Sequence, residues 1–167
     1  MKADFCRTFK QDMKRLYLLS FLLTAERQSA EQCFASSLGD CMDLRPVFKE
    51  WTSSWTRRVV LQNAIRILEP VVSNEDEPSD VNLKSPDSRL SPVLRSVLQL
   101  PTFERFVFVM SVLEGYSDHE CSLLLKSTPR DVVVAKAAAL KHLAASARSK
   151  DFLQASSHAR QQLAPTA

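Results

Sequence analysis

Hydrophobic residues near the N-terminus recur every three or four positions, the spacing that places side chains on one face of an α-helix. Residues 5–23 keep this spacing over a long stretch, and the charged side chains among residues 10–15 lie largely on the opposite face. The polar segment 24–27 interrupts the pattern. The sequence therefore predicts a long amphipathic helix followed by a break.

Two further helices are expected in the N-terminal part. Ser29 and Gln32 have the spacing of a capping box, in which two side chains bond the free amides at a helix start. They predict a short helix over residues 30–38, and Gly39 is expected to end it. A third helix is predicted over residues 43–69. Its hydrophobic stripe contains Leu44, Val47, Phe48, Trp51, Trp55, Val59 and Ile65.

A proline-rich, acidic segment follows. Five of the eight prolines fall between residues 70 and 101, and residues 73–80 are polar, acidic and without hydrophobic periodicity. Because proline removes a backbone donor and interrupts helices, a flexible linker is expected over residues 70–90. The predicted organisation is an N-terminal helical domain (1–69), the linker (70–90), a second helical domain (91–150) and a tail (151–167) that should fray.

Shorter helices are expected after the linker. Ser91 followed by Pro92 predicts a helix start, because proline fits the first helical position, and this helix should end near residue 98. Residues 103–113 predict the next helix. Gly115 should end it in a left-handed conformation.

The last two predicted helices have the spacing of a helix-turn-helix motif. Ser117 and Glu120 form a second capping-box pattern before a short helix that ends near residue 125. Residues 126–128 form a turn, and Thr128 caps a longer helix that begins at Pro129 and runs to about residue 148. A two-turn helix, a short turn and a longer helix is an arrangement that many DNA-binding proteins use.

The composition favours an all-α fold and argues against several classes of function. Only two of the 167 residues are glycine, whereas folds built on tight hairpins need many glycines at positive φ. No apolar run approaches the roughly 18 residues of a membrane span, and no signal-peptide pattern is present, so a cytoplasmic protein is expected. The sequence contains no nucleophile–base pair or glycine-rich phosphate loop, so we expect neither an enzyme nor a cofactor.

Cysteine spacing and charge add two smaller expectations. The four cysteines are scattered, contain no CxxC pair and are expected to be buried hydrophobic residues, with no metal site. They are Cys6, Cys33, Cys41 and Cys121. The net charge is only +3, but residues 70–99 are acidic and the blocks on either side are mildly basic, a distribution that suits two domains facing nucleic acid.

Residues 100–132, LPTFERFVFVMSVLEGYSDHECSLLLKSTPRDV, resemble the C-terminal DNA-binding domain of bacterial RNA polymerase sigma factors of the extracytoplasmic-function type. The stretch 14–34 is similar to the first two helices of that family's N-terminal domain. The stretch 48–66 is similar to its tryptophan-bearing helix, which reads and melts the downstream promoter element. The matching C-terminal positions are Leu100-Pro101, Arg105, Val107-Phe108, Glu114-Gly115, Ser117, Glu120, Leu124-Leu125, Thr128, Val132, Ala139 and Leu143.

This resemblance implies a transcription initiation protein that binds the RNA polymerase core and double-stranded promoter DNA. An anti-sigma protein is a further candidate partner. The residues implied in DNA binding are Ser117, Thr128, Arg130, Lys136 and Lys141. Those implied in contacting and melting the downstream element are Trp55, Arg57, Arg58 and Asn63. Glu31 and Gln32 are implied in binding polymerase.

The sequence also departs from the family pattern. Lys126 stands where the family commonly has a turn glycine, and the DNA-facing positions of the last helix carry Asp131, Val133, Val134, Ala135 and Ala138 in place of mostly basic and polar side chains. The alternative is therefore a degenerate sigma-like adaptor that acts through protein contacts without reading a promoter. An exposed basic face on the last helix favours DNA, whereas a contiguous aliphatic patch favours a protein partner. Trp51 and Trp55 also fit a role as core anchors.

Overall fold

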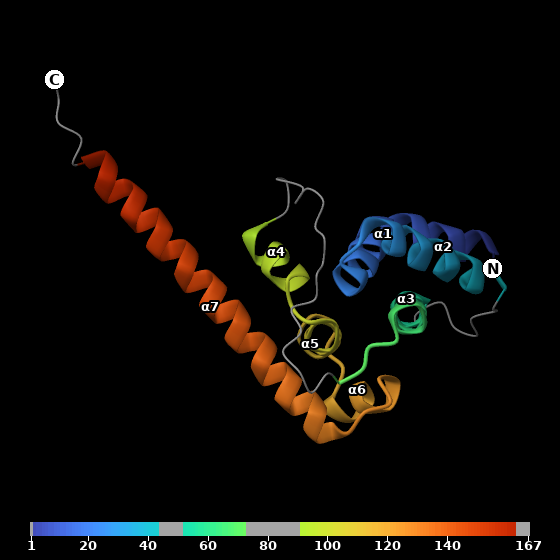
Figure 1. Cartoon of the computed structure of the whole chain (residues 1–167). Coiled ribbons are helices and arrows are strands. Elements are labelled where there is room, and N and C mark those ends of the chain that lie inside the picture. The colour runs from blue at the N-terminus through green and yellow to red at the C-terminus, as the bar shows by residue number, and fades with distance from the viewer. Residues whose placement is uncertain (1, 44–51, 73–90, 163–167) are drawn as a thin grey trace.

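The computed structural model describes residues 2–43, 52–72 and 91–162, and these form helices and their connections with no strand among them (Figure 1). The predicted all-α class is therefore confirmed. The helices are α1 (Lys2–Thr24), α2 (Arg27–Asp43), α3 (Thr52–Leu68), α4 (Pro92–Leu98), α5 (Thr102–Phe108), α6 (Asp118–Leu124) and α7 (Pro129–Gln162). A π-helical turn, η2 (Val109–Leu113), continues α5.

Helices α1, α2 and α3 pack against one another. Leu16, Leu19 and Leu23 of the predicted α1 face are buried, whereas Met13 is exposed. The break between α1 and α2 lies where the pattern is interrupted, and Ala25 there has a φ of 56°. The buried residues of these helices include Leu16, Leu19, Leu22, Leu23, Ala30, Cys33, Val60, Leu61 and Ala64. Burial of this apolar surface supplies most of the stabilisation of helices that are only moderately favoured by propensity.

Three details of this part of the sequence prediction are wrong. Helix α2 begins at Arg27, so Ser29 lies inside the helix, and its hydroxyl donates to Glu26 Oε2 (2.5 Å) and does not cap the helix. Gly39 does not end α2, which continues to Asp43, so Asp43 does not start the third helix. A helical glycine costs only about 1 kcal/mol relative to alanine, which packing on either side can offset. Residues 44–51 of the predicted third helix, which include Trp51, lie outside the described residues.

The C-terminal helices follow the sequence prediction more closely. Helix α4 starts at Pro92 after Ser91, although the Ser91 hydroxyl makes no capping bond. The helix of α5 and η2 ends at Leu113, and Gly115, two residues later, has the expected left-handed φ of 74°. Helix α7 is longer than predicted, because residues 151–162 continue it to Gln162 where a frayed tail was expected.

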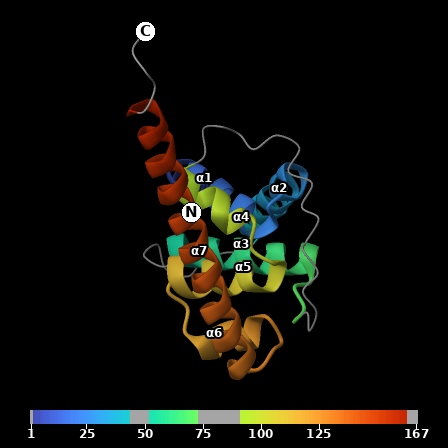
Figure 2. The same cartoon turned by 60° about the vertical axis from the view of Figure 1, so that its left-hand side comes forward.

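The N-terminal and C-terminal helices share one hydrophobic core. Helix α1 contacts both α4 and α5, and α7 packs against α4, α5 and α6 (Figures 1 and 2). Leu23 from α1 and Phe106 from α5 belong to the same buried cluster. Each half therefore covers part of the hydrophobic surface of the other. The division into two separately folding domains joined by a flexible linker stays a prediction, and most of that linker lies outside the described residues.

Arg105 is the main polar link between the two halves. It is only 2% exposed, and its Nε donates to the carbonyl of Leu23 at the end of α1 (3.1 Å). Its Nη1 donates to the carbonyls of Leu98 (3.5 Å) and Leu100 (2.9 Å) at the end of α4. One side chain thus satisfies carbonyl groups at two helix ends, which otherwise lack partners.

Candidate functional site

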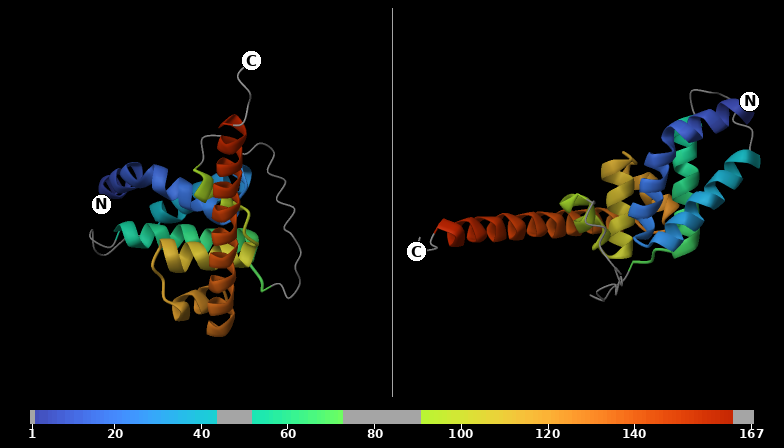
Figure 3. Two further views of the ribbon diagram at one scale, coloured as in Figure 1. Left: turned by 90° about the vertical axis from the view of Figure 1, so that its left-hand side faces the viewer. Right: turned by 90° about the horizontal axis from the view of Figure 1, so that it is seen from above.

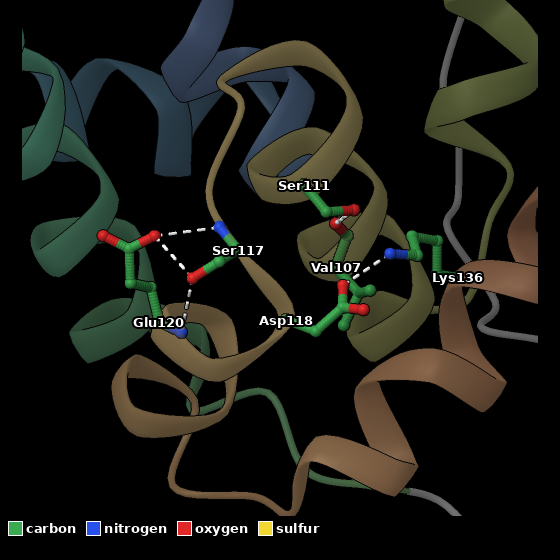
Figure 4. A network of polar contacts seen from close by, with 6 residues as sticks. All are labelled: Val107, Ser111, Ser117, Asp118, Glu120 and Lys136. Atoms are coloured by element: carbon green, nitrogen blue, oxygen red, sulfur yellow. Dashed lines mark hydrogen bonds and ion pairs between the residues drawn. The ribbon is translucent and has the colours of Figure 1, made fainter.

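The start of α6 is closed by its own side chains. The Ser117 hydroxyl accepts a bond from the Glu120 amide (3.2 Å), and Glu120 Oε2 accepts from the Ser117 amide (2.9 Å) and hydroxyl (2.7 Å), as Figure 4 shows. The predicted capping box is confirmed. These hydrogen bonds lower the pKa of Glu120, so the carboxylate stays ionised at this helix start.

The start of α7 has the same design. The Asp131 amide donates to the Thr128 hydroxyl (3.2 Å), and Asp131 Oδ2 accepts from the Thr128 amide (3.1 Å) and hydroxyl (2.6 Å). These bonds also lower the pKa of Asp131. Ser117 and Thr128 therefore serve as helix caps. A phosphate at either helix start would meet a carboxylate that already occupies the amides.

The two capping carboxylates should make stability depend on pH in the acid range. Their folded pKa values are lowered, so the unfolded chain takes up these protons more readily. The stabilisation is present above the unfolded pKa, about 4, and is lost as the pH falls through the lower folded pKa. In urea titrations, Glu120→Gln and Asp131→Asn should be less stable than the wild type at about pH 7 and nearly equal to it near pH 2.

Glu69→Gln is the matched control, because it removes an exposed carboxylate that caps no helix start. If the two cap variants lose as much stability near pH 2 as at about pH 7, the capping carboxylates are not the cause of the acid dependence.

The turn between α6 and α7 spans residues 125–128, one residue more than predicted. Lys126 has a φ of 51°, the left-handed region that glycine adopts most easily. The Ser127 amide donates to the Ser122 carbonyl (3.0 Å), which closes the end of α6. Lys126 thus adopts the backbone conformation for which the resembling family commonly uses glycine.

Helix α7 presents an inner and an outer face near its start. Val132, Ala135 and Ala139 are buried, whereas Arg130, Val133, Val134, Ala137, Leu140, Lys141 and Arg148 are exposed. Further along, His142 Nδ1 lies 3.1 Å from Glu104 Oε2 on α5. Of the aliphatic residues that depart from the family pattern, Ala135 therefore belongs to the core, and Val133 and Val134 lie on the outer face.

Lys136 does not belong to this outer face. Its Nζ lies 2.5 Å from Asp118 Oδ1, and the side chain is 30% exposed (Figure 4). The ion pair joins α7 to the first residue of α6 and supports the packing of the two helices. The predicted role of Lys136 in DNA contact stays a prediction.

The residues predicted to contact the downstream element come to lie in three different environments. Trp55 is half-buried and packs against the core. Arg57 and Arg58 are exposed, and Arg57 Nη1 is 3.5 Å from Glu114 Oε2 at the end of η2. Burial raises the pKa of Tyr116, and the positive charges of Arg58 and Arg57 oppose that shift. The arginine pair of α3 therefore lies beside the segment that leads into α6.

Asn63 is a correction to the sequence prediction. It is 2% exposed, and its Nδ2 donates to Ser37 Oγ (3.1 Å) and to Asp40 Oδ2 (2.9 Å) on α2. A buried amide with both of its donors used cannot reach a nucleic acid. Its role in this structure is to join α3 to α2.

The polymerase-binding candidates lie on the surface of α2. Glu31 and Gln32 are both exposed, and Glu31 Oε1 accepts from Arg27 Nε at 2.8 Å. An exposed ion pair of this kind contributes little to stability, so Glu31 can leave Arg27 and turn toward a partner at low cost.

The described residues offer little for other chemistry. No group of three His, Cys, Asp or Glu side chains in the described part of the chain could hold a metal ion. Cys33, Cys41 and Cys121 are buried, and burial raises their thiol pKa values, to about 12 for Cys41 and about 11 for Cys121. None of the described helices combines the length and hydrophobicity that a bilayer crossing requires.

Comparisons with protein-family models, with curated proteins and with solved structures found no match to this chain. The function is therefore inferred from the residues of this chain alone. Sequence reasoning missed two polar links between the halves, namely Arg105 and the Arg57–Glu114 pair. Their partners are 82 and 57 positions away in the sequence, and no local pattern indicates them.

Proposed function

We propose that this protein is a sigma-factor-like transcription initiation protein, which binds the RNA polymerase core through its N-terminal helices and promoter DNA through α6 and α7. The observation that carries the proposal is the outer face near the start of α7, where Arg130 and Lys141 are exposed while α6 packs behind the helix. In a helix-turn-helix protein this end of the second helix enters the major groove. Arg148 continues the basic face toward the next phosphates.

Two exposed arginines of α3 support a second DNA contact. Arg57 and Arg58 lie on the surface beside the segment before α6, and their guanidinium groups suit phosphate oxygens. In the N-terminal half, Glu31 and Gln32 on the outside of α2 are the proposed polymerase contacts.

The adaptor function is the second candidate, and two observations favour it. Val133, Val134 and Leu140 are 49%, 61% and 48% exposed on the outer face of α7. The carboxylates of Glu120 and Asp131 also occupy the helix starts at which phosphates commonly bind. A protein surface tolerates both features better than a DNA backbone does.

A paired assay of DNA binding and polymerase capture separates these functions. Arg130→Ala should weaken binding to a specific promoter duplex by about 1–3 kcal/mol if the side chain reads a base, and leave polymerase capture unchanged. Glu31→Ala should weaken polymerase capture and leave the gel shift unchanged. Arg66→Ala, which removes an exposed arginine near the end of α3, is the matched control.

The same assay can favour the adaptor. If Arg130→Ala leaves DNA binding untouched while Val133→Ser with Val134→Ser abolishes a protein interaction, the transcription initiation proposal fails and the adaptor replaces it.

A further inference from the structure

The outer face of α7 combines aliphatic and basic side chains and contains no acid. No Asp or Glu occurs between Asp131 and Asp151 in the sequence. Arg130, Lys141 and Arg148 are exposed. The positive charge of Arg130 helps to lower the pKa of its neighbour Asp131, whereas Lys141 lies ten positions from the nearest Asp or Glu in the sequence. A helix face with an excess of positive charge is suited to a partner of the opposite charge.

The aliphatic residues on this face have the spacing of a helix–helix contact. Val133, Ala137, Leu140 and Ala144 are all exposed and follow one another at intervals of four, three and four positions. At 3.6 residues per turn these positions form one continuous stripe, which we call the α7 seam. Arg130, Lys141 and Arg148 project along one edge of the same stripe, because their spacings of 11 and 7 are close to whole numbers of turns.

The α7 seam has room for a second helix. Helix α7 extends well beyond the rest of the molecule, and no other described helix lies along its outer side (Figure 3). The alanines of the seam allow another backbone to approach closely, and Val133 and Leu140 provide larger apolar contacts. From Arg130 to Arg148 the seam and its basic edge cover 19 residues, which correspond to about 28 Å of helix.

We propose that the α7 seam docks an acidic amphipathic helix of a partner protein. An apolar stripe on that helix would cover Val133 and Leu140, and its glutamates would pair with Lys141 and Arg148. Charge selects this occupant over a second copy of the chain, because two α7 helices laid together would bring like charges into contact. The seam also lacks the large aromatic and leucine content typical of helices that bind membrane surfaces.

The proposed docking site overlaps the proposed DNA site. Arg130 and Lys141 belong to both, so a bound acidic helix would exclude the duplex from the start of α7. This consequence, regulation by competition, rests on the proposed function. The docking itself does not rest on it.

Fluorescence anisotropy with the full-length chain tests the docking. The probe is a labelled helical peptide of about 18 residues with leucines on one face and glutamates along its edges, compared with a scrambled peptide of equal composition. Two paired variants change the site, namely Val133→Ser with Leu140→Ser for the seam and Lys141→Glu with Arg148→Glu for the basic edge. Val93→Ser with Lys14→Glu is the control, because it removes an exposed valine and an exposed lysine elsewhere.

We expect each site variant to weaken peptide binding by about tenfold or more, with the control and the far-UV circular dichroism unchanged. Equal binding of the scrambled peptide, or loss of binding only on charge reversal, would overturn the proposal in favour of unspecific charge attraction. Self-association of the chain that is lost in the seam variant would overturn it in favour of a second copy.

A competition measurement keeps the two proposals distinguishable. Peptide should displace a labelled promoter duplex from the wild-type chain. Binding of peptide without any binding of duplex would remove the proposed function and leave the docking intact. Binding of duplex without any binding of peptide would remove the docking and leave the proposed function intact.

Discussion

Replacing Arg105 with methionine should lower the free energy of unfolding by about 3–4 kcal/mol. The guanidinium donates to the carbonyls of Leu23, Leu98 and Leu100, and methionine would leave these groups without their donor. Burial lowers the pKa of Arg105 to about 10, so the side chain is still charged at neutral pH. Urea denaturation followed by circular dichroism and by tryptophan fluorescence measures the loss.

Arg66→Met is the matched control, because Arg66 is exposed and should change stability by no more than about 0.5 kcal/mol. Circular dichroism reports all of the helices, whereas tryptophan fluorescence reports the surroundings of the tryptophans, of which Trp55 lies in α3. If Arg105→Met has the same free energy of unfolding as the control, Arg105 does not hold the N-terminal and C-terminal helices together.

Asn63→Ala should destabilise the protein by about 2–3 kcal/mol and leave its DNA affinity unchanged. The substitution removes two donors from a buried network and leaves Asp40 and Ser37 without this partner. A residue that contacted promoter DNA would show the opposite pattern, with lost affinity and little lost stability. Thermal unfolding combined with a gel shift well below the unfolding temperature distinguishes the two.

Gln62→Ala provides the control for this substitution, because Gln62 is the exposed neighbour on α3. Should Asn63→Ala weaken DNA binding more than Gln62→Ala while stability is retained, the structural role assigned to Asn63 is wrong.

Local patterns predicted most of the helices because their causes are local. The Ser117–Glu120 capping box is present as predicted, since the chain before it turns through the left-handed Gly115 and the helix must begin anew. The similar Ser29–Gln32 pattern failed because the chain turns earlier, at Ala25, and α2 is already formed at Ser29. A capping pattern alone therefore does not locate the turn that precedes it.

The site was harder to predict because its charges have distant partners. Lys136 was expected on the DNA face, but its partner Asp118 is 18 positions away on another helix. Asn63 was expected to be exposed, but its partners lie on α2, at 26 and 23 positions. Arg130 and Lys141 are exposed on α7, as a DNA-contacting role requires, and that role stays a prediction.

The salt dependence of duplex binding tests the central claim that the outer face of α7 binds DNA. Arg130, Lys141 and Arg148 provide three exposed cations, and each phosphate contact contributes about 0.9 to the slope of log affinity against log salt. With Arg57 and Arg58 as the two further proposed phosphate contacts, we expect a slope of about 4.5 in magnitude for the wild-type chain and about 2.7 for Arg130→Ala with Lys141→Ala. Duplex binding that does not change with salt, or an equal slope in the double variant, would contradict the claim.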